Sequence, residues 1–157
     1  MHSILGGGTG KLEMLGFGPH LMLDGFHANP KKLTDAELLR QVLDELPAAL
    51  EMTKILPPLV FNGSEDLDGY AGLTGVVLIA ESHIAIHTFP EQDALVVDIF
   101  SCKDFDPQLA IKRLVDQFEI GRYTTYMINR GREIPKDLLL AQSIMAGERE
   151  YAETRIS

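Results

Sequence analysis

Alternating and continuous apolar runs predict strands along much of the chain. These runs span residues 20–26, 54–61, 73–80, 83–89, 94–100 and 121–129. The third, fourth and fifth runs follow one another with short connections, which favours antiparallel neighbours in one sheet. Pro57 and Pro58 interrupt the second run and favour a sheet edge or a bend, because proline has no N–H to donate to a neighbouring strand.

Two further stretches have apolar residues at helical spacing. Thr34 and Glu37 have the spacing of a capping box, which predicts a helix that begins near Asp35. Pro47 is expected to end or kink that helix, and Asp106 can cap a second one. The apolar positions are Leu38, Leu39, Val42, Leu43 and Leu46 in the first helix, and Ala110, Ile111, Leu114, Val115 and Phe118 in the second.

The predicted order of elements is strand, helix, four strands, helix and strand, which indicates an α+β fold. We expect a two-layer sandwich in which a largely antiparallel sheet carries both helices on one face. The other face, if apolar, would need a partner, and this predicts a dimer packed through its sheets. At 157 residues the chain suits one domain, with residues 1–17 as a flexible leader and 146–157 as a mobile tail.

Composition narrows the functional classes. The chain carries 14 Lys and Arg against 23 Asp and Glu, and its net charge of −9 opposes the attraction on which nucleic-acid binding depends. It has no apolar run of about 18 residues to span a bilayer, and its first residues lack the apolar core of a secretion signal. The single cysteine, Cys102, cannot form an internal disulfide, which favours a reducing compartment. We therefore expect a cytoplasmic protein that binds neither nucleic acid nor membranes.

The segment AESHIAIHTFPEQDALVVDIFSC, residues 80–102, gathers residues that a hydrophobic core does not need. His83 and His87 would suit a metal on a helix, but four residues of strand span about 13 Å, so a shared metal would require a bend. Cys102 could be a nucleophile activated by a histidine, although a lone cysteine at the end of an apolar strand is more often a small buried hydrophobe. If the two runs that carry them are neighbours in a sheet, His87 and Cys102 could line one pocket.

Ser82 lies between Glu81 and His83 in the tight connection between two predicted strands. It could simply complete a turn, as serine often does. It could instead attack the carbonyl of Glu81: the peptide would become an ester, loss of the Ser82 α-proton would leave dehydroalanine, and hydrolysis would yield a pyruvoyl group. Such chemistry requires a strained backbone and a nearby base, which a turn crowded with serine and histidine can provide.

The segment GLTGVVLIAESHIAIHTFPE, followed by VVDIFSC, resembles the self-processing core of the prokaryotic S-adenosylmethionine decarboxylases. The resemblance extends from about His20 to Asn129, and its serine, histidine and cysteine stand at the family's spacings of five and twenty residues. It implies cleavage before Ser82 into a β chain, residues 1–81, and an α chain, residues 82–157.

The resemblance also implies a role for each residue of the site. Ser82 becomes the covalent pyruvoyl cofactor, which forms a Schiff base with the substrate amine. His87 matches the histidine that removes the α-proton during processing, and Cys102 matches the cysteine that acts as general acid in decarboxylation. Thr74 stands where the family usually has a serine that assists processing, so the hydroxyl is kept and a methyl group is added. Glu91 matches a glutamate that hydrogen-bonds the ribose hydroxyls.

The loop before Thr74 departs from the family pattern. Asp68 stands where an aromatic residue is expected to stack on adenine, and Tyr70 lies close by in the same loop. Asp66 and Asp68 would instead suit the cationic end of arginine or ornithine, which some relatives decarboxylate. We expect a lyase of polyamine biosynthesis that makes decarboxylated S-adenosylmethionine, the aminopropyl donor for spermidine. Decarboxylation of arginine or ornithine is the alternative, and a non-catalytic homodimeric binding domain, in which Ser82 only completes a turn, is the third interpretation.

Overall fold

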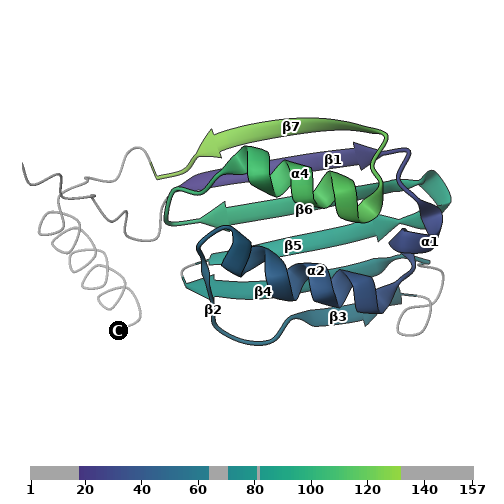
Figure 1. The fold of residues 1–157 in the computed structure, drawn as a ribbon, viewed down its shortest axis with the longest axis horizontal. Coiled ribbons are helices and arrows are strands. Elements are labelled where there is room, and N and C mark those ends of the chain that lie inside the picture. The colour runs from purple at the N-terminus through teal and green to yellow at the C-terminus, as the bar shows by residue number, and fades with distance from the viewer. Residues whose placement is uncertain (1–17, 64–70, 81, 132–157) are drawn as a thin grey trace, which may run out of the picture.

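The computed structural model describes residues 18–63, 71–80 and 82–131 of the chain. Seven strands form one sheet in the order β2-β4-β5-β6-β1-β7, with β3 also paired to β4 (Figure 1). The strands are β1 (Pro19–Phe26), β2 (Thr53–Lys54), β3 (Leu59–Asn62), β4 (Leu73–Ala80), β5 (Ser82–Phe89), β6 (Ala94–Ser101) and β7 (Arg122–Asn129). The helices are α1 (Pro30–Leu33), α2 (Ala36–Ala49), α4 (Pro107–Phe118) and the short 3-10 helix η1 (Pro90–Gln92). Every strand pairing in these described ranges is antiparallel.

Both long helices, α2 and α4, lie on the same face of the sheet, so the molecule has two layers (Figure 1). Burial alternates along the strands: in β6, Leu95, Val97 and Ile99 are buried in the core between the sheet and the helices. Gly75 of β4 lies against α2, where an added Cβ would come within 2.5 Å of Leu43 Cδ1, so a larger residue would force the Leu43 side chain to move. The predicted α+β sandwich with its helices on one face is confirmed.

Asp35, not Thr34, caps α2. The Asp35 carboxylate accepts a hydrogen bond from the backbone N–H of Leu38 at 2.9 Å, while Thr34 ends the preceding short helix α1. The capping-box assignment was therefore wrong by one residue, because a carboxylate accepts strongly and is favoured by the positive end of the helix dipole. Pro47 lies inside the last turn of α2, which ends at Ala49, as expected for a residue that removes a helical N–H.

The stretch 54–61, predicted as a single strand, forms parts of two. β2 ends at Lys54 and β3 begins at Leu59, and the two prolines lie between them. Both strands pair with β4, β2 near its end and β3 near its start. Consecutive prolines cannot donate ladder hydrogen bonds, so the chain leaves the sheet and returns to it further along the same neighbour.

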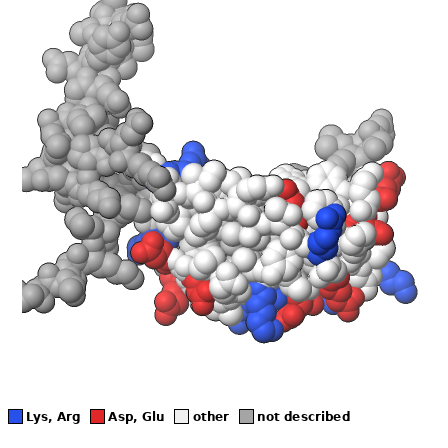
Figure 2. Space-filling model, turned by 90° about the horizontal axis from the view of Figure 1, so that it is seen from above, with Lys and Arg blue, Asp and Glu red and all other residues white. Residues whose placement is uncertain are grey.

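No described helix covers the other face of the sheet. The register aligns side chains across this open face in rows: one row contains His20, Phe100 and His83, and another contains His87 and Thr74. Large apolar side chains exposed on the open face are Leu59, Phe61, Leu78, Tyr126 and Ile128. Viewed from the side of β7, the charged side chains gather mostly along one margin and leave a broad uncharged surface (Figure 2).

Within the described ranges, no helix has the length and apolar character needed to cross a membrane.

Candidate active site

The β4–β5 hairpin ends in a backbone conformation that is unfavourable for serine. Ile79 pairs with Ser82 across the two strands, so the turn between them is tight. Ser82 has a φ of 133°, in the region that glycine adopts readily and residues with a Cβ do not. A conformation of this kind costs on the order of 1–3 kcal/mol, and such strain occurs mainly at functional sites. Glu81 lies outside the described residues.

The sheet brings Ser82 next to the end of β6. Ser82 pairs with Ser101, and Cys102 follows Ser101 directly, so residues twenty positions apart lie at the same end of the sheet. Ser101 and Cys102 are both buried. Gly18 packs against this segment: an added Cβ there would come within 2.3 Å of the Ser101 carbonyl oxygen. Gly18 therefore packs closely against the backbone that carries Cys102.

Thr74 and His87 form a second pair, further along the same two strands. They are direct partners across β4 and β5, and Thr74 Oγ1 lies 3.0 Å from His87 Nδ1. Both side chains are partly buried on the open face of the sheet. This hydrogen bond fixes the orientation of the imidazole and leaves Nε2 available for proton transfer.

Within one chain, the Ser82–Ser101 pair lies far from the Thr74–His87 pair. His87 follows Ser82 by five residues in a regular strand, which corresponds to about 16 Å along β5. The two residues also lie on opposite faces of the sheet, because Ser82 pairs with the buried Ser101 whereas His87 pairs with Val96 on the open face. The strands that carry His87 and Cys102 are neighbours as predicted, but these two side chains lie near opposite ends of them.

The row of the open face nearest to Ser82 contains a cluster that the sequence pattern did not reveal. His20 Nε2 lies 3.0 Å from Asp98 Oδ1, and the guanidinium of Arg130 stacks over the Phe100 ring at 4.3 Å from its centre. His83 contacts the same ring edge-on, with 6.2 Å between the ring centres. Only the register brings together these residues from three strands and Arg130, which directly follows β7, so alternation within one strand could not have identified them.

Of the substrate-binding candidates, the structure describes Glu91. Glu91 lies exposed in η1, directly after β5. Asp66, Asp68 and Tyr70 lie outside the described residues, but the loop that contains them is closed at its base by a 2.8 Å hydrogen bond from the Gly63 N–H to the Gly72 carbonyl. No cluster of three or more potential metal ligands exists among the described residues.

Comparisons with known proteins agree with this architecture. The sequence model of the S-adenosylmethionine decarboxylase family matches residues 19–131. The S-adenosylmethionine decarboxylase proenzyme of Archaeoglobus fulgidus is 32% identical over 116 residues, which cover 73% of this chain and 97% of the relative. The proenzyme of Thermodesulfovibrio yellowstonii is 33% identical over 119 residues, covering 75% and 84%. The crystal structure of the adenosylmethionine decarboxylase from Aquifex aeolicus superimposes with a TM-score of 0.62 at 30% identity, covering 73% of this chain and 91% of that one. The chain therefore belongs to the S-adenosylmethionine decarboxylase family.

Proposed function

We infer that the chain is the proenzyme of a pyruvoyl-dependent S-adenosylmethionine decarboxylase, a lyase that supplies the aminopropyl donor for spermidine. The observation that carries this inference is the strained Ser82, with its φ of 133°, at the hairpin where the sequence resemblance implies cleavage. A serine that only completed a turn would not need this conformation, because common turns accept serine without strain. The non-catalytic interpretation is therefore disfavoured.

Processing begins with a reaction between neighbouring residues of the hairpin. Ser82 Oγ adds to the carbonyl carbon of Glu81, and the peptide C–N bond breaks to give an ester and a free amine. A base removes the Ser82 α-proton, the Cβ–O bond breaks, and the Glu81 carboxylate leaves. The resulting dehydroalanine tautomerises to an imine, which water hydrolyses with release of ammonia to leave a pyruvoyl group at the new N-terminus. Relief of the strained conformation favours the first step.

We propose that His87 is this base and that the Thr74 hydroxyl holds its imidazole in position. Since about 16 Å of strand separates His87 from Ser82 in one chain, the base must come from a second copy. A twofold dimer packed through the open faces would place the Thr74–His87 pair of one protomer against the Ser82 hairpin of the other. The exposed apolar side chains of that face, among them Leu59 and Tyr126, would then be buried.

The mature site would combine groups from both ends of the sheet. The pyruvoyl group supplies a carbonyl that withdraws the electron pair released as carbon dioxide leaves. Cys102 would donate the proton that replaces the carboxyl group, and Glu91 would accept hydrogen bonds from the ribose hydroxyls. The loop with Asp68 and Tyr70 would contact the part of the substrate beyond the sulfonium. A cytoplasmic location suits Cys102, because a thiol that donates a proton must remain reduced.

Denaturing electrophoresis tests the proposal directly. Purified protein should separate into two pieces, with a reactive carbonyl on the piece that begins at residue 82, whereas Ser82→Ala should remain a single chain. Release of carbon dioxide should then be measured side by side from S-adenosylmethionine, L-arginine and L-ornithine. An intact wild-type chain without a carbonyl would refute the enzyme proposal. Turnover of arginine or ornithine alone would keep the pyruvoyl mechanism and change the substrate, and Asp68→Ala should then raise KM for that amino acid.

A further inference from the structure

Thr88 is a fully buried polar residue next to the proposed processing base. Its side chain is 0% exposed, and Ser101 is the other buried polar residue in the described part of the chain. Its hydroxyl accepts a hydrogen bond from the backbone N–H of Leu73 and donates one to the carbonyl oxygen of Leu33, both at 2.8 Å. These partners are 15 and 55 residues away in sequence. A hydroxyl that bridges two distant backbone groups in a core fixes their relative position.

The first of these bonds lies beside the Thr74–His87 pair. Leu73 precedes Thr74 in β4 and Thr88 follows His87 in β5, so the Leu73–Thr88 contact is the next step of the same strand pairing. The backbone pairing of β4 with β5 begins at Thr74 and His87. The hydrogen bond from the Leu73 N–H to the Thr88 hydroxyl adds one further contact between the two strands beyond that point. The base of the loop that carries the substrate-binding candidates closes directly before this point, at Gly72.

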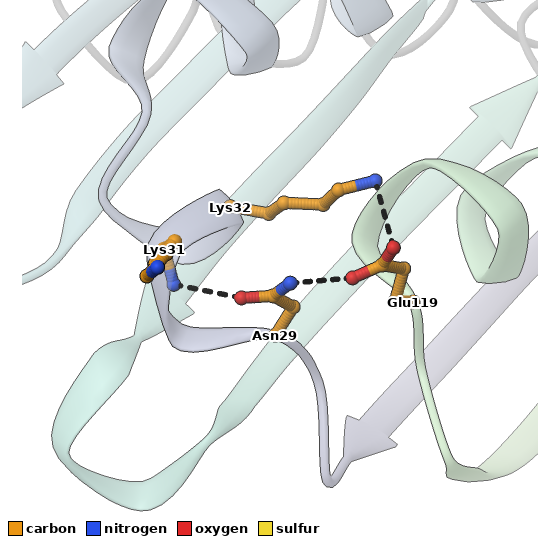
Figure 3. A network of polar contacts seen from close by, with 4 residues as sticks. All are labelled: Asn29, Lys31, Lys32 and Glu119. Atoms are coloured by element: carbon orange, nitrogen blue, oxygen red, sulfur yellow. Dashed lines mark hydrogen bonds and ion pairs between the residues drawn. The ribbon is translucent and has the colours of Figure 1, made fainter.

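The second hydrogen bond, from the Thr88 hydroxyl to the Leu33 carbonyl oxygen, connects this end of the two strands to helix α1. Leu33 is the last residue of α1, whose first turn is capped by the Asn29 side chain through a 3.0 Å bond from the Lys31 N–H. Asn29 Nδ2 also donates to Glu119 Oε2 at 2.5 Å, and Lys32 Nζ lies 3.5 Å from Glu119 Oε1 (Figure 3). Glu119, directly after α4, therefore contacts both the N-cap residue and the third residue of α1, and Thr88 connects the last residue of α1 to the processing pair.

We propose that Thr88 is a positioning residue that fixes the imidazole of His87 for removal of the Ser82 α-proton. The inference rests on the proposed role of His87. Without the hydroxyl, the Leu73 N–H and the Leu33 carbonyl lose a shared partner in a buried site, and the ends of β4 and β5 can shift relative to each other. Misplacement of a catalytic group by about 1 Å can cost on the order of 10²-fold in rate. The step affected is the one in which the Cα–H bond and the Cβ–O bond break, so the ester that precedes it should accumulate.

The test compares Thr88→Val, which keeps the shape and removes the hydroxyl, with Thr88→Ser, which keeps the hydroxyl. Cleavage by hydroxylamine measures the ester, and the appearance of the carbonyl measures completed processing. We expect Thr88→Val to complete processing at least about tenfold more slowly with ester accumulation, and Thr88→Ser to restore most of the rate. Leu114→Ala, on the buried side of α4, is the control for general destabilisation: it should lower Tm without accumulation of ester. If Thr88→Val yields no folded protein, Thr88→Ala replaces it, with the same expected direction.

Two negative results remain distinguishable. If His87→Ala accumulates ester but neither hydroxyl-free variant does, the proposed role of His87 stands and the role of Thr88 is refuted. If His87→Ala processes normally, the role of His87 fails first, and the positioning role falls with it. Accumulation of ester in Leu114→Ala to the same extent would also overturn the inference, because loss of stability alone would then explain the effect.

Discussion

The separation of Ser82 and His87 predicts that processing occurs between protomers. Five residues of β5 correspond to about 16 Å, whereas a general base must come within about 3 Å of the proton it removes, or act through one water. Ser82→Ala and His87→Ala chains with different tags should each remain unprocessed when expressed alone. When they are co-expressed, the mixed dimer has one complete site, made of Ser82 from one chain and His87 from the other. Statistical mixing places about half of the His87→Ala chains in such dimers, so up to about half of them should be cleaved.

The reciprocal mixture provides the control. A chain with both substitutions, co-expressed with the wild type, should stall cleavage of the wild-type chain within mixed dimers, because that chain then meets only alanine at position 87. Electrophoresis of affinity-purified mixed dimers measures both results. Absence of cleavage in the first mixture, together with complete cleavage of the wild-type chain in the second, would show that His87 acts within its own chain and would refute the composite site.

Two further predictions follow from other parts of the structure. Cys102→Ala should process but should decarboxylate about 10²- to 10⁴-fold more slowly, as expected for loss of a positioned general acid; normal turnover would exclude that role. At Glu119, the hydrogen bond from Asn29 lowers the carboxyl pKa below its ordinary value of 4.5. A lowered pKa stabilises the folded state above the unfolded-state value, and this contribution disappears as the pH falls through the folded-state pKa. Unfolding measured across the acid range should therefore show a shallower loss of stability below about pH 4.5 in Glu119→Gln than in the wild type, and identical slopes would contradict the assignment.

The sequence determined the elements of the fold where local signals agreed. The apolar runs at residues 73–80 and 94–100 predicted β4 and β6 almost to the residue, and the structure shows that burial alternates along both strands. The second long helix followed from its apolar spacing and from Asp106, whose carboxylate accepts from two backbone N–H groups as expected of a cap. The prediction was less accurate where local signals competed. Asp35 caps α2 in place of Thr34, and consecutive prolines divide one predicted strand into two.

The sequence also identified the candidate chemistry, since Glu81, Ser82, His87 and Cys102 stand at spacings that few unrelated proteins would share. It could not decide which of these residues meet. Only the strand register shows that Ser82 lies beside the segment that contains Cys102 and that Thr74 pairs with His87. These two pairs lie near opposite ends of β5. Spacing along a chain does not specify which residue of the neighbouring strand lies opposite. A shift of one residue in the pairing register would move every side chain of a strand to the other face of the sheet. The distance between Ser82 and His87, on which the proposed second protomer rests, is therefore decided only by the tertiary structure.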